Sequence, residues 1–220
     1  MEFGPKRNEE SKKTMARYTG PKNRLARREG VDLGFKTVGS NAHASLLRRL
    51  TTPPGVHGAK RKGATSNFGI QLREKQKAKR LYSVMERQFR NYFTEASKQT
   101  GNTGLALLQR LETRLDNIVY RLSLAPTRAS ARQLVNHRHV VVNGKTVGIP
   151  SYHVMINDVV ALKPKALTIP AVTKLLDEKN PVIPGWLERK GPVGKLLHVP
   201  DRAQLDLDIN ESLIVEYYSR

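Results

Sequence analysis

The sequence contains no cysteine among its 220 residues. Disulfides and thiolate-bound zinc are therefore excluded, and the absence fits a reducing compartment. No stretch approaches the roughly 20 consecutive apolar residues that a membrane-spanning helix needs. The first residues, Met1 to Thr14, also lack the apolar core of a secretory signal peptide. We therefore expect a soluble protein that is not secreted by that route.

Acidic residues are the scarce charged type. The chain has 19 Asp and Glu residues against 39 Lys and Arg residues, which gives a formal net charge of +20 and a pI near 10.4. A compact protein with such a charge repels itself, and phosphates of a bound polyanion relieve the repulsion. Charge alone leaves nucleic acid, an anionic membrane surface and an acidic protein open as partners. We favour nucleic acid, because a basic balance over a whole domain is typical of proteins that bind it.

The first part of the chain is polar and basic. Residues 1–45 show little helical or strand periodicity, so we expect a basic arm that is ordered largely by its partner. Residues 1–14 precede Met15-Ala16-Arg17-Tyr18, which reads like a natural start, so they are interpreted as an upstream extension or an added segment. A loop rich in proline and glycine follows over 51–69, and it carries the adjacent cations Lys60, Arg61 and Lys62.

Residues 70–98 repeat apolar side chains at spacings of three and four, which predicts one long amphipathic helix. A basic stripe lies beside the apolar one and contains Arg73, Lys77, Arg80 and Arg87. This stripe is either an RNA-binding face or a solvated charged face. The Gly101 to Gly104 stretch then marks a turn or domain boundary.

Two further helices are predicted, over 105–124 and 128–137. Pro126 ends the first of them, and Thr127 is the expected N-cap of the second. Arg128 and Arg132 lie one turn apart in the second helix and are expected on its surface.

A β-hairpin is predicted over 140–147, because Asn143-Gly144 between β-rich flanks is the strongest short hairpin signal. A strand over 158–163 would complete the small module. Proline-rich connections follow, with a short helix near 171–179 and a strand-like run over 212–218. Trp186 is expected to pack in a core or a lid.

Several short motifs of this region together resemble the S-four RNA-binding motif. They are Arg114-Leu115-Asp116-Asn117, Tyr120-Arg121-Leu122, Thr127-Arg128-Ala129, Ala131-Arg132-Gln133-Leu134-Val135, His137, and Val142-Asn143-Gly144-Lys145. Four more segments are similar to the small-subunit ribosomal protein S-four family. They are Pro54-Gly55-Val56-His57-Gly58, Leu72-Arg73-Glu74-Lys75-Gln76-Lys77, Arg87-Gln88-Phe89, and Ile214-Val215-Glu216-Tyr217-Tyr218. The resemblance covers nearly the whole chain from Met15 on, and it is to the type without zinc cysteines, bacterial or organellar.

The resemblance implies an α+β fold in which a helical domain holds an inserted RNA-binding module, two helices packed on a short antiparallel sheet. The helical domain would span 46–104 and be completed by 175–220, and the module would span 105–174. The implied function is that of a structural constituent of the small ribosomal subunit. Such a protein binds the 5′ domain of small-subunit rRNA early in assembly and contributes to translational accuracy near the messenger entry channel.

The implied partners are small-subunit rRNA, neighbouring ribosomal proteins and messenger RNA, with no membrane, cofactor or metal. The protein would be cytoplasmic and ribosome-bound, in a bacterium or an organelle. Folded RNA is recognised mainly by shape and phosphate contacts, which suits a basic concave face. The candidate RNA-binding residues are Lys60, Arg61, Lys62, Arg73, Lys77, Arg80, Arg87, Arg114, Arg121, Thr127, Arg128, Arg132, Gln133, His137, Asn143 and Lys145.

Two positions depart from the family pattern. Arg138 stands where relatives often have glycine, so the helix end there is expected to differ. Asn157 replaces a glycine in a turn, which is easily accommodated because asparagine tolerates left-handed backbone geometry.

Other functions fit less well. An RNA-modifying enzyme of the pseudouridine synthase type shares the small module, but the residues around Asp116 do not match its catalytic motif and no separate catalytic domain follows. His137 and His139 have no further ligands at zinc spacing. A free-standing RNA chaperone or translational repressor with the same module is the alternative that stays open.

Overall fold

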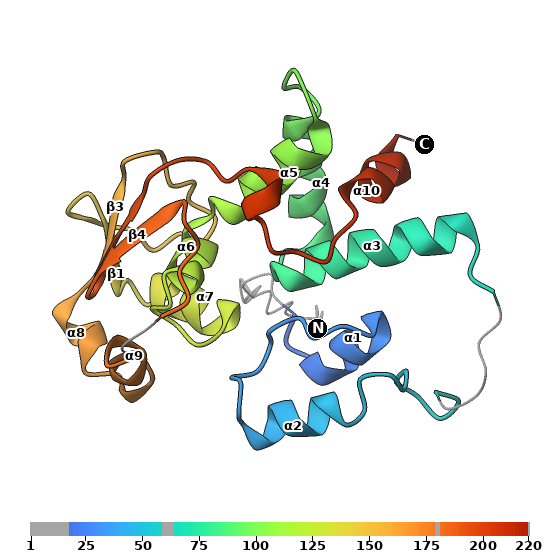
Figure 1. Cartoon of the computed structure of the whole chain (residues 1–220), viewed down its shortest axis with the longest axis horizontal. Coiled ribbons are helices and arrows are strands. Elements are labelled where there is room, and N and C mark those ends of the chain that lie inside the picture. The colour runs from blue at the N-terminus through green and yellow to red at the C-terminus, as the bar shows by residue number, and fades with distance from the viewer. Residues whose placement is uncertain (1–17, 59–63, 179–180, 220) are drawn as a thin grey trace, which may run out of the picture.

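The computed structural model describes residues 18–58, 64–178 and 181–219 (Figure 1). Helices on one side of the molecule face a small sheet with its own helices on the other. The helical part comprises α1 (Lys22–Glu29), α2 (Asn41–Leu47), α3 (Asn67–Leu81), α4 (Glu86–Ala96), α5 (Thr103–Glu112) and α10 (Glu211–Tyr218). The module comprises α6 (Leu115–Arg121), α7 (Arg128–Asn136), β1 (Val140–Val142), β2 (Lys145–Thr146), β3 (Val159–Leu162), α8 (Pro164–Leu167), α9 (Pro170–Leu176), β4 (Leu187–Lys190) and β5 (Val193–Leu196). A 3₁₀ turn, η1 (Arg202–Gln204), lies between β5 and α10.

The expected single helix over 70–98 is wrong, because the chain turns sharply between α3 and α4. Ser83 adopts a left-handed backbone with a φ of 53°. The Val84 N–H then donates to the Lys79 carbonyl at 3.0 Å, which satisfies an orphan carbonyl at the end of α3. The apolar period continues across this turn, since both helices pack on one core. Periodicity alone therefore could not reveal the break.

The expected helix over 105–124 is also two helices, α5 and α6, with the break at Arg114. The first amides of α6 bond to another segment of the chain instead of to α5. The Leu115 N–H donates to the Tyr152 carbonyl at 2.8 Å, and the Asp116 N–H donates to the Pro150 carbonyl at 3.2 Å. Partners 34 or more residues away in the sequence thus satisfy the orphan donors of the second helix.

The prediction that residues 1–45 form an arm ordered only by its partner is wrong for residues 18–45. Helix α1 lies beside α3, and α2 lies beside α1 (Figure 1). This segment has a small apolar core formed by Ala26, Leu33, Phe35 and Leu46, against which Leu81 of α3 packs. The apolar residues of this segment are few and irregularly spaced, so the segment needs α3 to complete its core. The part of the arm over residues 1–17 lies outside the described residues.

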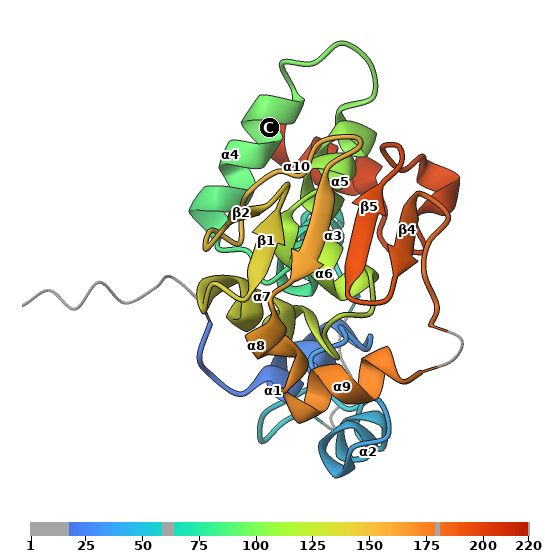
Figure 2. The ribbon, with the colours of Figure 1, turned by 90° about the vertical axis from the view of Figure 1, so that its left-hand side faces the viewer.

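The sheet is antiparallel, with the strand order β2-β1-β3-β5-β4 (Figure 2). The predicted hairpin is confirmed: Asn143 and Gly144 both have positive φ, at 47° and 78°, as a type I′ turn requires. The predicted strand over 158–163 is confirmed as β3, which pairs with β1.

Strands β4 and β5 were not predicted, and they belong to the module's sheet. β5 pairs with β3, so the segment after α9 returns to the sheet before the chain leaves for the helical part. Within 175–220, it is α10 and the segment just before it that pack on the helical part: α10 contacts α3 and α5, and Ile209 lies in their core. The prediction of a strand over 212–218 is wrong, because these residues form the helix α10. Asn210 is the N-cap of this helix, and its side chain accepts from the Ser212 N–H.

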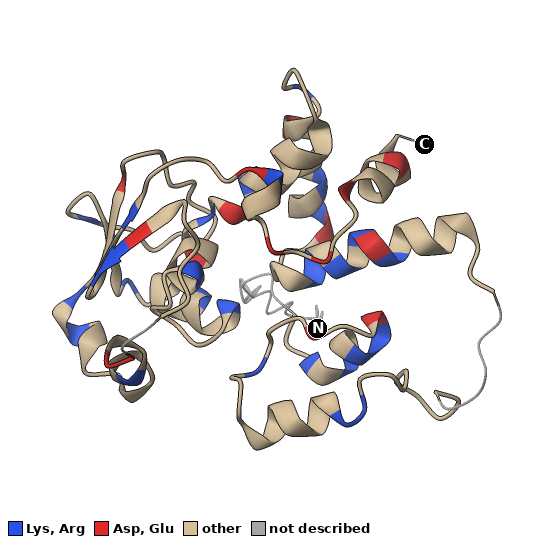
Figure 3. Cartoon of the chain, viewed as in Figure 1, with Lys and Arg blue, Asp and Glu red and all other residues tan. Residues whose placement is uncertain are grey.

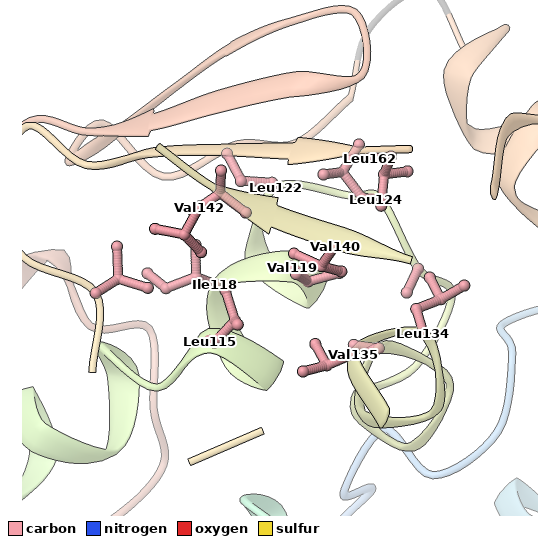
Figure 4. Packing of buried hydrophobic residues seen from close by; sticks show 14 of the residues in the cluster. Leu115, Ile118, Val119, Leu122, Leu124, Leu134, Val135, Val140, Val142 and Leu162 are labelled. Atoms are coloured by element: carbon pink, nitrogen blue, oxygen red, sulfur yellow. The ribbon is translucent and has the colours of Figure 1, made fainter. Parts of the chain in front are cut away.

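The module's core lies between the sheet and helices α6 and α7 (Figure 4). Leu115, Ile118 and Val119 of α6 and Leu122, its C-cap, lie in this core and are fully buried. Trp186 is also fully buried in this core, as predicted. Burial of a large apolar side chain typically stabilises a fold by about 1.5–3 kcal/mol, so this core holds the module together.

Arg138 and Asn157 both adopt the left-handed backbone that favours glycine, with φ of 60° and 70°. The Arg138 position ends α7 in the same way as Ser83 ends α3, since the His139 N–H donates to the Leu134 carbonyl at 3.1 Å. The expectation of a different helix end at Arg138 is therefore wrong. The left-handed backbone conformation typically costs a residue with a Cβ atom about 1–2 kcal/mol of folding free energy relative to glycine.

Candidate RNA interface

Helix α7 is fixed at its start by the residue that the sequence predicts as its N-cap. The Thr127 hydroxyl accepts from the Ser130 N–H at 3.1 Å, which satisfies one of the helix's unpaired amides. Thr127 is itself buried. Arg132, on the next turn, is half-buried and donates to the Ser83 carbonyl at 3.2 Å. Helix α7 therefore contacts the α3–α4 turn through an arginine that was predicted to bind RNA.

Arg114 is fully enclosed, with 0% of its surface exposed. Its Nε and Nη2 atoms donate to the two carboxylate oxygens of Asp116 at 3.0 and 2.7 Å, and its Nη1 atom donates to the Tyr92 hydroxyl at 2.6 Å. Burial opposes the charged form, but Asp116 raises the pKa of Arg114 above its ordinary value. A side chain in this position has no surface to offer to RNA. The structure therefore assigns Arg114 to holding α6 against α4.

Glu112 is the centre of a buried charge network, which we define as Tyr82, Glu112, Asn117, Arg121 and Arg128. Its carboxylate accepts from the Tyr82 hydroxyl at 2.7 Å, from the Asn117 amide at 2.6 Å and from Arg121 at 2.8 and 3.0 Å. Burial alone would raise the pKa of Glu112, but the Arg121 guanidinium lowers it below its ordinary value. Burial and Glu112 together raise the pKa of Tyr82 well above 10. The network joins the end of α3 to α6.

Arg128 completes the buried charge network, and the prediction that it lies on the surface is wrong. Only 9% of Arg128 is exposed. Its Nε atom donates to the Asn117 side-chain oxygen at 2.8 Å, and its guanidinium lies 4.5 Å from the centre of the Tyr120 ring. Sequence spacing placed it on the outer side of α7, but the end of α3 and helix α6 cover that side.

The basic stripe on α3 mainly holds neighbouring parts of the chain. Arg73 and Arg80 both bind the Glu29 carboxylate of α1, which is 1% exposed. Burial raises the pKa of Glu29, and Arg80 and Arg73 oppose that effect. Lys77 donates to the Asp208 carbonyl at 2.9 Å. These cations are partly exposed, yet each has a partner within the chain. The stripe is therefore neither simply an RNA-binding face nor simply a solvated charged face.

The remaining candidate residues face solvent. The exposed ones among the described candidates are Arg87, Gln133, His137, Asn143 and Lys145. The Asn143 side chain also fixes the hairpin to β3, because its amide donates to Asp158 at 2.7 Å and its oxygen accepts from the Val159 N–H at 2.9 Å. Lys60, Arg61 and Lys62 lie outside the described residues. Their contact with RNA stays a prediction, as it does for the exposed set.

Sequence reasoning missed further exposed cations. They include Arg24, Arg28, Arg48, Arg49, Arg138 and Lys165. A simple sequence signal could have found Arg48, Arg49 and Arg138, because the chain has no Asp or Glu at all over 33–73 and over 117–157. The segment 201–216, by contrast, carries five carboxylates and one cation. Blue segments accordingly lie on α1, α7 and around α8 in Figure 3, and red ones gather between η1 and α10.

Within the described ranges, no three His, Asp or Glu side chains lie close enough together to hold a metal ion. None of the helices in these ranges combines the length and hydropathy of a membrane span.

Two family models match adjoining parts of the chain. The ribosomal protein S4/S9 N-terminal domain matches residues 17–112, and the S4 domain matches residues 113–160. The small ribosomal subunit protein uS4 of Xanthomonas campestris pv. campestris is 50% identical over 210 residues, which cover 94% of this chain and 100% of that protein. The uS4 proteins of Xanthomonas oryzae pv. oryzae and Xanthomonas axonopodis pv. citri match with the same identity and coverage. The chain therefore belongs to the uS4 family of small ribosomal subunit proteins.

Proposed function

We propose that this chain is a structural constituent of the small ribosomal subunit that binds small-subunit rRNA. The relatives that are 50% identical to this chain are small ribosomal subunit proteins, and the match covers their full length. One observation supports the RNA interface. Exposed cations directly after α2 and α7 and on the β1–β2 hairpin lie on two stretches of chain, 33–73 and 117–157, that contain no carboxylate; they are Arg48, Arg49, Arg138 and Lys145. Such surfaces attract phosphates, and carboxylates within the same stretch do not neutralise them.

Phosphate and shape contacts are the recognition mode that this geometry favours. The A-form major groove is too deep and narrow for side chains to read, so proteins contact folded RNA through its backbone, its minor groove and its unpaired bases. Helix α7 and the hairpin stand on a rigid core, which holds their exposed side chains in fixed positions. A preformed surface of this kind suits a junction of RNA helices.

Binding to the 5′ domain, an early place in assembly and an effect on translational accuracy near the messenger entry channel belong to the same proposal. So do contacts with neighbouring ribosomal proteins and with messenger RNA. All follow from the uS4 family. We also propose that the chain has no catalytic activity. The buried carboxylates Glu112 and Asp116 are each bound by guanidinium donors, which suits a structural role better than proton transfer.

Sedimentation tests the proposal against a free-standing RNA chaperone or repressor. A tagged chain expressed in its own host is expected to sediment with small subunits at physiological salt. A chain that stays at the top of the gradient, while a known small-subunit protein sediments normally, would favour the free-standing factor.

Salt dependence tests the proposed phosphate contacts. If six or more phosphates are bound, the affinity for a 5′-domain rRNA transcript should fall about a thousandfold or more between 50 and 200 mM salt. Filter binding over this range measures the slope. A flat response would contradict recognition through phosphates.

A further inference from the structure

A groove of about 670 Å³ lies where α1, the α3–α4 turn and α7 meet. Segments far apart in the sequence line it: residues 18–35, 76–85 and 127–136. Its volume is within the range of about 300–1,000 Å³ that is typical of pockets for small ligands. The groove therefore offers room for a group the size of one nucleotide.

The lining of this groove is positive. Its charged residues are Lys22, Lys79, Arg80 and Arg132, and no carboxylate is among its lining residues. The carboxylates that bind these cations stand outside the lining: Glu86 lies 2.9 Å from Lys79, and Asp116 lies 3.8 Å from Arg132. These ion pairs hold the cations in place while leaving the groove itself free of negative charge. An anion is the ligand that such a lining favours.

Apolar and neutral polar side chains complete the lining. Tyr18 is 44% exposed at the groove, Phe35 is nearly buried beneath it, and Met85 is 42% exposed. Ser130 and Gln133 of α7 add neutral hydrogen-bonding groups. An aromatic ring beside cations and amide donors is the combination that binds an unpaired base together with its phosphate.

We propose that this groove takes a single unstacked nucleotide of the bound RNA, with its phosphate toward the cations and α7 and its base against Tyr18. The inference rests on the proposed rRNA binding and adds a defined pocket to it. A base held there would fix the position of the RNA relative to both the helical part and the module, because both contribute to the lining.

A pair of charge variants tests the phosphate part of the proposal. Gln133→Glu adds a carboxylate inside the groove, and Gln99→Glu adds the same charge at an exposed position after α4. Gln133→Glu should weaken binding to refolded full-length small-subunit rRNA by about tenfold or more, because like charges placed together are costly. Gln99→Glu changes only the net charge and should weaken binding to the same rRNA by about twofold or less.

A second pair tests the base. Tyr18→Ala removes the ring and should weaken binding by about tenfold, whereas Tyr18→Phe keeps the ring and should bind like the parent chain. Thermal unfolding of all four variants shows whether each is folded. Ultraviolet crosslinking of the parent complex should also join Tyr18 to one nucleotide.

The outcomes separate this inference from the proposed function. If Gln133→Glu and Tyr18→Ala are folded and bind like their matched controls, the pocket proposal is overturned while rRNA binding stands. If the parent chain itself does not bind the rRNA, the proposed function fails, and the inference fails with it. The pocket proposal would also be overturned if the chain bound free nucleoside monophosphates tightly and saturably while Gln133→Glu left its RNA affinity unchanged. The ligand of the groove would then be a free nucleotide and not a nucleotide of the RNA.

Discussion

Two sets of polar residues have similar chemistry and opposite surroundings, one at the boundary between the module and the helical part and one on the surface of the module. The buried charge network around Glu112 is enclosed between α3, α6 and α7, and its hydrogen bonds all end on other residues of the chain. By contrast, Gln133 of α7, His137 directly after it and Lys145 of the hairpin are exposed. Asn117, Arg121 and Arg128 of the network and all three exposed residues come from the segments that resemble the S-four motif.

The difference shows that one motif encodes two tasks. The enclosed arginines fix how α6 and α7 pack on the helical part. Each donates hydrogen bonds to a buried carboxylate or amide oxygen that would otherwise lack a partner. The exposed residues are then carried in fixed positions by that core. Mutations in the first set should therefore act through folding, and mutations in the second set should act through RNA binding.

Removal of the central carboxylate should have the largest effect on the free energy of unfolding. Glu112→Ala leaves the Arg121 charge and the Tyr82 hydroxyl buried without their partner. Breaking a buried ion pair in this way typically costs about 3–5 kcal/mol. Urea unfolding measures the loss. The exposed carboxylate variant Asp206→Ala is the control and should change stability by about 0.5 kcal/mol or less.

Arg128→Ala should destabilise the fold by about 2 kcal/mol, because a buried hydrogen bond from a charged group to Asn117 is lost. The stacking of its guanidinium on Tyr120 is lost as well. Urea unfolding measures this effect too, with the exposed Arg48→Ala as the matched control. An unchanged midpoint together with weaker RNA binding would show that Arg128 belongs with the exposed set.

Lys145→Ala should leave the unfolding free energy within about 0.5 kcal/mol of the parent chain, since the side chain is exposed on β2. Its effect should appear in RNA binding, as a decrease of about 0.9 in the slope of affinity against salt concentration on logarithmic scales. Lys98→Ala, exposed after α4, is the matched control. Equal salt slopes for Lys145→Ala and Lys98→Ala would show that the hairpin does not contact RNA phosphates through Lys145.

A further prediction concerns the pH dependence of stability through Glu86, which is partly exposed and binds Lys75 and Lys79 at 2.7 and 2.9 Å. Burial alone would raise the pKa of Glu86, but hydrogen bonds from Lys75, Lys79 and Tyr218 lower it to about 2 from an ordinary value of 4.5. A lowered pKa in the folded state adds stability above pH 4.5 that is lost as the pH falls towards 2.

Glu86→Gln should therefore be less stable than the parent chain at pH 6, and the difference should shrink as the pH approaches 2. Urea midpoints at both pH values measure it. A difference that stays constant with pH would show that the carboxylate charge does not contribute.

Local signals predicted the elements whose geometry depends on near neighbours. Asn143-Gly144 predicted the hairpin turn, and Thr127 predicted the start of α7, because each acts on backbone groups within three residues. The breaks at Ser83 and Arg114 and the strands β4 and β5 were missed. Each of these depends on partners elsewhere in the chain, such as the Tyr152 carbonyl that receives the first amide of α6.

The sequence by itself determined the basic charge balance, the hairpin turn at Asn143-Gly144 and the helix start at Thr127, because charge and turn chemistry are properties of the chain alone, and its motifs pointed to the S-four family. Only the tertiary structure decided which cations are available to RNA. An arginine on a helix surface is exposed or enclosed according to what packs against that surface. Here Tyr92 of α4 and Asp116 of α6 enclose Arg114, and Tyr82 after α3 together with α6 covers Arg128, whereas Lys145 is left exposed.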